Sequence, residues 1–223
     1  MLTRVHRQKR LEFAQQYRNW TTSDWQKVAF SDESRFVLHR VDGRWRIRRE
    51  TSERQHSETL IGRTQAGGGS VMVWGIVSWY SLGPLIPIEG TLNRFGYLSI
   101  LADAVHPYMF TVFPDGDGTF QQDNAPCHTA AIIKDWLEEH NQEFQVLPWP
   151  PNSPDLNPIE SLWDHLDRHV RRMEPPPHTL QQLLDSLQSA WLQIPETTFH
   201  NLIASLPRRL AAVRAAKGGY SGY

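Results

Sequence analysis

The stretch that most constrains the fold of this chain runs from Phe120 to Trp163. It predicts a short buried strand at 120–123, a turn through Asn124-Ala-Pro126, and then a helix whose apolar stripe runs from Ile132 to Leu137. A second short strand is predicted at 144–147. A strand, a helix and a strand in this order favour an α/β protein.

A proline-rich crossing follows this unit and leads into a strong helix start. Five prolines between Pro148 and Pro158 restrict the backbone to an extended, rigid path. Asn157 is expected to cap the next helix, with Glu160 at its third position. The pattern Asn-x-x-Glu is also a capping box, in which Glu160 would only hold the helix end. The two interpretations are compatible, because the helix dipole keeps a first-turn glutamate ionised, as a metal ligand must be.

Composition indicates a folded globular protein with a substantial core. The chain has 223 residues, 39% of them hydrophobic, and nine are tryptophan. We expect no membrane span and no signal peptide, because no window approaches about 18 consecutive apolar residues and the N-terminus is basic. The single cysteine, Cys127, excludes an internal disulfide. The net charge of −1 does not by itself indicate a nucleic-acid binder.

The remaining segments predict strands first and helices last. Strong strands are expected at 28–39, which carries Asp32, and at 71–79, a near-continuous apolar run typical of a buried central strand. We therefore predict a mixed sheet flanked by helices. Three parts are expected: an N-terminal helical lead-in (1–26), a core (27–173) with an insertion at about 40–69, and a C-terminal helical extension (174–223) that is frayed over 219–223.

Arginines gather in the expected insertion. Residues 35–63 hold eight arginines against four acids, and Asp42-Gly43 predicts a hairpin with a returning strand. Arg44, Arg46 and Arg48 alternate on that strand, so they would share one face, and Arg49 follows them. A solvated face is the plainer interpretation of this run, and contact with DNA phosphates is the functional one.

Common cofactor and metal motifs are incomplete in this chain. Gly62 to Gly67 has the glycine spacing of a phosphate loop but lacks the following Lys-Ser/Thr, and Asp115 to Gly118 lacks the other ligands of a calcium loop. Cys127-His128 has no partners at zinc-ligand spacing. We expect no small-molecule organic cofactor. What remains is a set of three acids: Asp32, Asp123 and Glu160.

These acids lie in segments that resemble the catalytic domain of Tc/mariner-superfamily DDE transposases, on the Tc-like branch. The matching motifs are Ser31–Ser34, Gly67–Gly75, Gln121–His128 and Trp149–Trp163, and with the chain between them they cover nearly all of residues 3–218. The resemblance implies an RNase H-like fold with a clamp-like β-hairpin insertion. It implies that Asp32, Asp123 and Glu160 are catalytic and bind two ions of Mg²⁺ or Mn²⁺. Double-stranded DNA as substrate, a homodimer and a nuclear location are implied as well.

Asn124 and His128, which follow Asp123 in the sequence, are candidate accessory residues. Two departures from the family pattern also bear on function. The paired helix-turn-helix modules that read transposon ends have no counterpart here, which leaves end recognition unaccounted for. Asp123 and Glu160 are separated by 36 residues, slightly more than is commonest in the family, which we interpret as a longer loop around 141–152.

Electrostatics supports the metal-binding interpretation independently. Two carboxylates about 4 Å apart repel by roughly 4 kcal/mol at an effective dielectric constant of about 20. Three converging acids would therefore protonate or move apart without a cation. Ligation by oxygen alone favours Mg²⁺ or Mn²⁺ over Zn²⁺.

Three functions compete at this point. The first is a transposase that hydrolyses phosphodiester bonds at transposon ends and joins the freed 3′-hydroxyl to target DNA. The second is an RNase H-like metal nuclease, which would cut DNA but never join it. The third is a truncated, transposon-derived module that binds DNA or protein without transposition activity, and this reading must explain why the acids are intact. A strand-transfer assay separates the first two.

Overall fold

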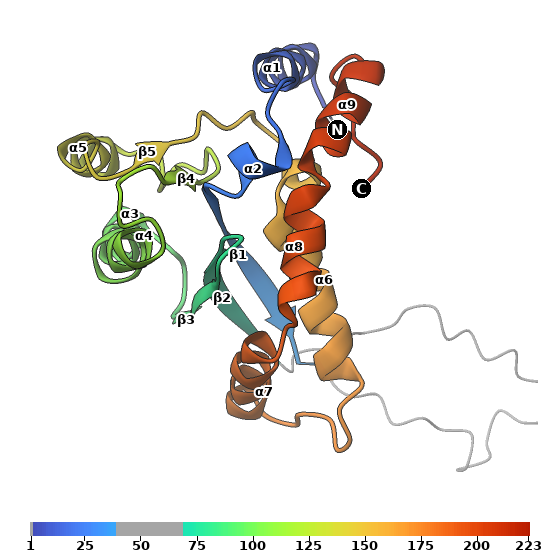
Figure 1. The fold of residues 1–223 in the computed structure, drawn as a ribbon. Helices are drawn as coiled ribbons and strands as arrows, with labels where there is room; N and C mark the ends of the chain where they lie inside the picture. Colours follow the sequence, from blue (N-terminus) through green and yellow to red (C-terminus); the bar gives the residue numbers. More distant parts are fainter. Residues whose placement is uncertain (1, 39–68) are drawn as a thin grey trace, which may run out of the picture.

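The computed structural model describes residues 2–38 and 69–223, which form one mixed sheet with helices on both faces (Figure 1). The expected hairpin and nearly all of the insertion at 40–69, including Arg44, Arg46, Arg48 and Arg49, lie outside the described residues. The helices and helical turns are α1 (Arg4–Gln16), α2 (Thr22–Trp25), α3 (Arg94–Ile100), the π-helical turn η3 (Leu101–Val105), α4 (His106–Val112), α5 (Ala131–Glu139), the 3₁₀ turn η4 (Pro154–Leu156), α6 (Pro158–Arg171), α7 (Leu180–Leu192), α8 (Glu196–Ala204) and α9 (Leu206–Ala215).

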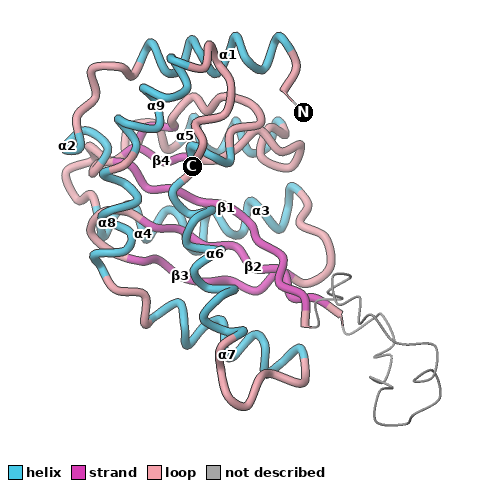
Figure 2. The backbone as a smooth tube through the Cα atoms, turned by 90° about the vertical axis from the view of Figure 1, so that its right-hand side faces the viewer, coloured by secondary structure: helices cyan, strands magenta, loops and turns pink. Residues whose placement is uncertain are grey.

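Five strands make the sheet, in the spatial order β3-β2-β1-β4-β5. Three of them, β1 (Val28–Val37), β2 (Ser70–Val77) and β3 (Leu82–Ile88), pair antiparallel, and Figure 2 shows them side by side. β4 (Thr119–Gln121) pairs parallel with β1, and β5 (Gln145–Val146) pairs parallel with β4. The α/β expectation is confirmed, and β1, β2, β4 and β5 begin and end within two residues of the predicted limits.

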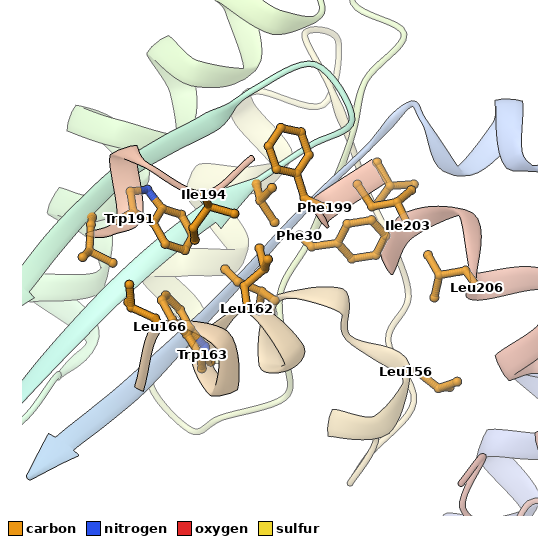
Figure 3. Close-up of a cluster of buried hydrophobic side chains, with 14 of the residues drawn as sticks. Phe30, Leu156, Leu162, Trp163, Leu166, Trp191, Ile194, Phe199, Ile203 and Leu206 are labelled. Atoms are coloured by element: carbon orange, nitrogen blue, oxygen red, sulfur yellow. The ribbon is translucent and has the colours of Figure 1, made fainter. Parts of the chain in front are cut away.

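Both faces of the sheet are buried, because successive side chains along a strand point to opposite faces and apolar residues occupy both sets of positions. Along β1, Val28 and Phe30 pack into one apolar cluster and Ala29 packs into the other. The first cluster joins the sheet to α6, α7, α8 and α9, and Figure 3 shows its centre, where Phe30 lies near Leu162 and Phe199. The second cluster joins the opposite face to α3, η3, α4 and α5.

The two ends of the chain pack together beside the sheet. α1 lies against α9, and Phe13 and Tyr17 of α1 belong to the same apolar cluster as the C-terminal helices. Ser221 is buried, and its backbone N–H donates to Asp155 at 2.7 Å. The expectation that residues 219–223 are frayed is therefore wrong, because hydrogen bonds to Arg10 and Asp155, far away in the sequence, hold this segment in place. The division of the chain into three parts stays a prediction.

No helix in the described part of the chain combines the length and the apolar character needed to cross a membrane.

Candidate active site on β1, β4 and α6

Strand pairing places the first two acids on neighbouring strands. Phe30 of β1 pairs with Gln121 of β4 in parallel register. Asp32 lies two residues after Phe30, and Asp123 lies two residues after Gln121, so both acids lie at the same level of neighbouring strands. A polar contact strengthens this pairing, because the Ser31 hydroxyl donates to the Gln121 carbonyl at 2.8 Å and the Gln121 side chain accepts from the Ser31 N–H at 3.2 Å. Ser31 and Gln121 are both buried, so these bonds fix the two strands where the acids begin.

The third acid is brought to the same place by the start of α6. Asn157 caps the helix as predicted, accepting from the Ile159 N–H at 3.3 Å. The Asn157 amide also donates to the Ser31 carbonyl at 3.1 Å, which ties the helix start to β1 next to Asp32. Glu160 makes no capping box in α6. Its carboxyl lies beside Asp32 instead, so the capping-box alternative is not realised.

A glycine opposite Asp32 lets α6 approach the sheet. Gly75 of β2 pairs with Asp32, and a Cβ built at Gly75 would lie 2.7 Å from Cη2 of Trp163. Trp163 is buried on α6 and stacks on Trp191 at 5.3 Å between ring centroids. The missing side chain at Gly75 therefore sets the depth at which α6 sits, and with it the position of Glu160.

All three acids line one pocket of about 360 Å³, whose far wall is the proline-rich crossing from Trp149 to Pro154. Burial, the neighbouring Glu160 and then Glu33 raise the pKa of Asp32 from 3.8 to about 9. Burial also raises the pKa of Glu160, against the hydrogen bond from Asp32, which lowers it. Burial and the neighbouring carboxyl thus both disfavour the charged form of Asp32.

Asp123 is held by a buried histidine. Its Oδ1 accepts from the Ala125 N–H at 2.8 Å and from His128 Nδ1 at 2.7 Å. Burial raises the pKa of Asp123, but the bonds from His128 and Ala125 outweigh it, and the net shift is downward. His128 is 3% exposed, and its Nε2 lies 3.2 Å from Glu33 Oε1. Burial lowers the pKa of His128, but the two carboxylates outweigh it and raise the pKa to about 10, so both ring nitrogens donate.

Two neighbours complete this arrangement. The Tyr97 ring packs on His128 with centroids 3.9 Å apart, and its hydroxyl donates to the Gln122 side chain at 2.6 Å. The Asn124 amide donates to the Trp149 carbonyl at 2.9 Å, so it fastens the proline-rich crossing to the turn after Asp123. Sequence reasoning singled out His128 and Asn124 from their nearness to Asp123. It missed the contacts of Glu33 and Tyr97: Glu33 lies in the polar run 31–35, and Tyr97 is an aromatic residue on a helix, and neither pattern points to His128.

The three acids share a pocket without converging on one point. Within residues 2–38 and 69–223, only His106, His140 and Glu143 bring three possible ligand atoms within 4.8 Å of one another. Asp32 and Glu160 are in contact, whereas the Asp123 carboxylate is turned to His128. The donors are all oxygen atoms, as Mg²⁺ and Mn²⁺ prefer, so the residues present fit these ions.

Comparison with known proteins identifies the class. Residues 27–183 match the family described as DDE superfamily endonuclease. The chain is 38% identical over 217 residues to the transposable element Tcb2 transposase of Caenorhabditis briggsae, covering 97% of this chain and 78% of that protein. It is 35% identical over 222 residues to the Tc1 transposase of Caenorhabditis elegans, covering 100% and 80%. The chain therefore belongs to the DDE endonuclease family, as the resemblance to Tc-like transposases implied.

Solved structures show the same fold. The catalytic domain of the Mos1 mariner transposase superposes with a TM-score of 0.75 at 18% identity, covering 99% of this chain and 97% of that one. A Mos1 paired-end complex with the left transposon end superposes with a TM-score of 0.76 at 20% identity, covering 99% and 64%. At this identity the likeness establishes the fold, and it confirms the RNase H-like expectation.

Proposed function

We propose that this chain is the catalytic domain of a cut-and-paste DNA transposase, with Asp32, Asp123 and Glu160 as its metal-binding acids. The observation that carries the proposal is that these three acids line one pocket, whose walls are held by the bonds that join Gln121, Ser31 and Asn157. Membership of the DDE family supports an enzyme over a module that only binds. The relatives that cover most of the chain are transposases, which favours joining of DNA over simple cutting.

The residues of the site have separate tasks in this proposal. Asp32, Asp123 and Glu160 would hold two ions of Mg²⁺ or Mn²⁺, which when bound activate the attacking hydroxyl and stabilise the leaving oxygen in an in-line displacement at phosphorus. His128 keeps the Asp123 carboxylate ionised and oriented. Asn157 keeps Glu160 beside Asp32, and Asn124 holds the wall of the pocket. The chain supplies no nucleophile of its own, because water or a DNA 3′-hydroxyl attacks.

The natural partner in this proposal is double-stranded DNA. Transposon ends and target DNA would lie across the pocket, and Arg44, Arg46, Arg48 and Arg49 are the proposed phosphate contacts. The same proposal includes a homodimer, which would pair two transposon ends, and this is tested by light scattering with and without end DNA. It also includes a location in the nucleus, which is tested by imaging a fluorescent fusion.

The decisive experiment follows both cutting and joining. A pre-cleaved duplex from the inverted repeat beside the coding frame is incubated with the chain, Mn²⁺ and a supercoiled target, and joined products are scored. We expect joined products from the wild-type chain and from Asp103→Asn, which changes an exposed acid on η3. Asp32→Asn and Asp123→Asn should give none. Nicked target without joined product would favour the nuclease, and DNA binding without either would favour the non-catalytic module.

A further inference from the structure

A second group of metal-ligating side chains lies at the corner where α4, α5 and the turn before β5 meet. His106 is the first residue of α4, His140 directly follows α5, and Glu143 lies in the turn. One possible ligand atom from each lies within 4.8 Å of the other two. None of the three lines the pocket that holds the acids, so the corner is a separate feature of the fold.

His140 is oriented as a metal ligand would be. Its Nδ1 lies 2.8 Å from the Trp136 carbonyl oxygen, which can only accept, so Nδ1 carries the proton and Nε2 carries the lone pair. The ring also stacks on Trp136, with centroids 4.0 Å apart. The turn is fixed relative to this histidine, because the Glu143 N–H donates to the His140 carbonyl at 2.9 Å. The ligand atom of His140 is thus set in place before any ion arrives.

The other two ligands face each other and the solvent. His106 Nε2 contacts a carboxylate oxygen of Glu143. The side chains are 34% and 46% exposed, so an ion could reach them. An ordinary ion pair at the surface contributes little to stability and needs no third residue. The presence of a preoriented third ligand is what distinguishes the corner from an ordinary surface pair.

We propose that His106, His140 and Glu143 bind a zinc ion. Two imidazoles and one carboxylate are a ligand set that zinc takes readily, whereas Mg²⁺ prefers oxygen alone. Ligand atoms around tetrahedral zinc lie about 3.4 Å apart, given zinc–nitrogen bonds of about 2.0–2.1 Å, so small side-chain rotations suffice here. The fourth position faces solvent. The ion would tie α4 to the end of α5 and to β5 at the edge of the sheet, a structural role separate from the DNA chemistry.

The proposal is tested by zinc titration of the intact chain with Mg²⁺ in large excess, so that magnesium rather than zinc occupies the pocket of Asp32, Asp123 and Glu160. We expect one tightly bound zinc per chain. His106→Ala and His140→Ala should each weaken zinc binding at least about 100-fold, since loss of even an outer-shell partner costs about 10–100-fold. His169→Ala, on an exposed part of α6, is the matched histidine control and should bind like wild type. Asp123→Asn should also keep the zinc.

Two further readouts guard against trivial outcomes. Co²⁺ in place of zinc should give the visible absorption of a tetrahedral site in wild type and lose it in Glu143→Gln. Melting in chelator should be the same for the variants and the wild type, while zinc should raise only the wild-type melting temperature. The proposal is overturned if wild type and His106→Ala take up zinc equally, or if the zinc is lost in Asp123→Asn instead.

Discussion

The buried ion pair between Arg10 and Asp155 makes a sharp prediction about what holds the proline-rich crossing in place. Arg10 of α1 is 0% exposed, and its guanidinium meets the Asp155 carboxylate at 2.8 Å through both terminal nitrogens. The same guanidinium donates to the carbonyls of Asn152, Gly218 and Gly219. One side chain therefore joins the N-terminal helix, the wall of the acid pocket and the C-terminal segment.

Removing the Arg10 side-chain charge should lower the free energy of unfolding more than an ordinary surface substitution does. Arg10→Met keeps most of the apolar stem but leaves the Asp155 carboxylate, 8% exposed, without its counter-charge. Breaking one partner of a buried pair costs about 3–5 kcal/mol. Against a total stability of about 5–15 kcal/mol for a typical domain, that is a large share. Guanidinium unfolding followed by tryptophan fluorescence measures the change, and the exposed Arg208→Met should stay within about 0.5 kcal/mol of wild type.

The pH dependence of this loss has a definite sign. Burial raises the pKa of Asp155, but Arg10 and the Ser221 N–H outweigh it, and the pKa falls below its ordinary value of 3.8. A depressed pKa means that the ionised carboxylate stabilises the fold above the unfolded pKa, and that this stability is lost as pH falls through the folded pKa. The difference in the free energy of unfolding between wild type and Arg10→Met should thus be largest at neutral pH and shrink in acid. A cost below about 1 kcal/mol, or a gap that grows in acid, would refute the reasoning.

Four other outcomes are expected. Asp32→Asn should raise the melting temperature in chelator, because burial beside Glu160 penalises the charge; a clear drop would make Asp32 structural. His128→Ala should raise the Mn²⁺ concentration needed for cleavage by about 10–100-fold, and an unchanged requirement would remove its role in holding Asp123. Gly75→Ala should cost about 1–3 kcal/mol in chemical unfolding by forcing Trp163 away, and a neutral result would contradict the tight packing. Replacing Arg44, Arg46 and Arg48 with Ala should reduce the slope of log affinity against log salt by about 2–3, whereas an unchanged slope excludes these phosphate contacts.

The sequence predicted the strands and helices better than it predicted what holds them together. Local patterns were sufficient for the Asn157 cap and for the apolar run of β2, because caps and buried strands are written in neighbouring residues. The bonds from Ser31 to Gln121 and to Asn157 span 90 and 126 residues, and no local pattern encodes such pairings.

Two local patterns are overridden in the fold for the same physical reason. Glu160 fits a capping box by spacing, but the proximity of Asp32 decides where its carboxyl turns. The last residues look polar and free, yet Arg10 and Asp155 bind them from distant parts of the chain. In both cases a tertiary partner overrides the local preference, and this partner becomes visible only once the chain is folded.

The most direct test of the proposal that these three acids bind metal is anomalous scattering from a crystal of the chain soaked in Mn²⁺. The account predicts two peaks in the pocket, with carboxylate oxygens of Asp32, Asp123 and Glu160 bound to them. A well-ordered pocket that takes up no manganese, or peaks that touch none of these three side chains, would contradict it.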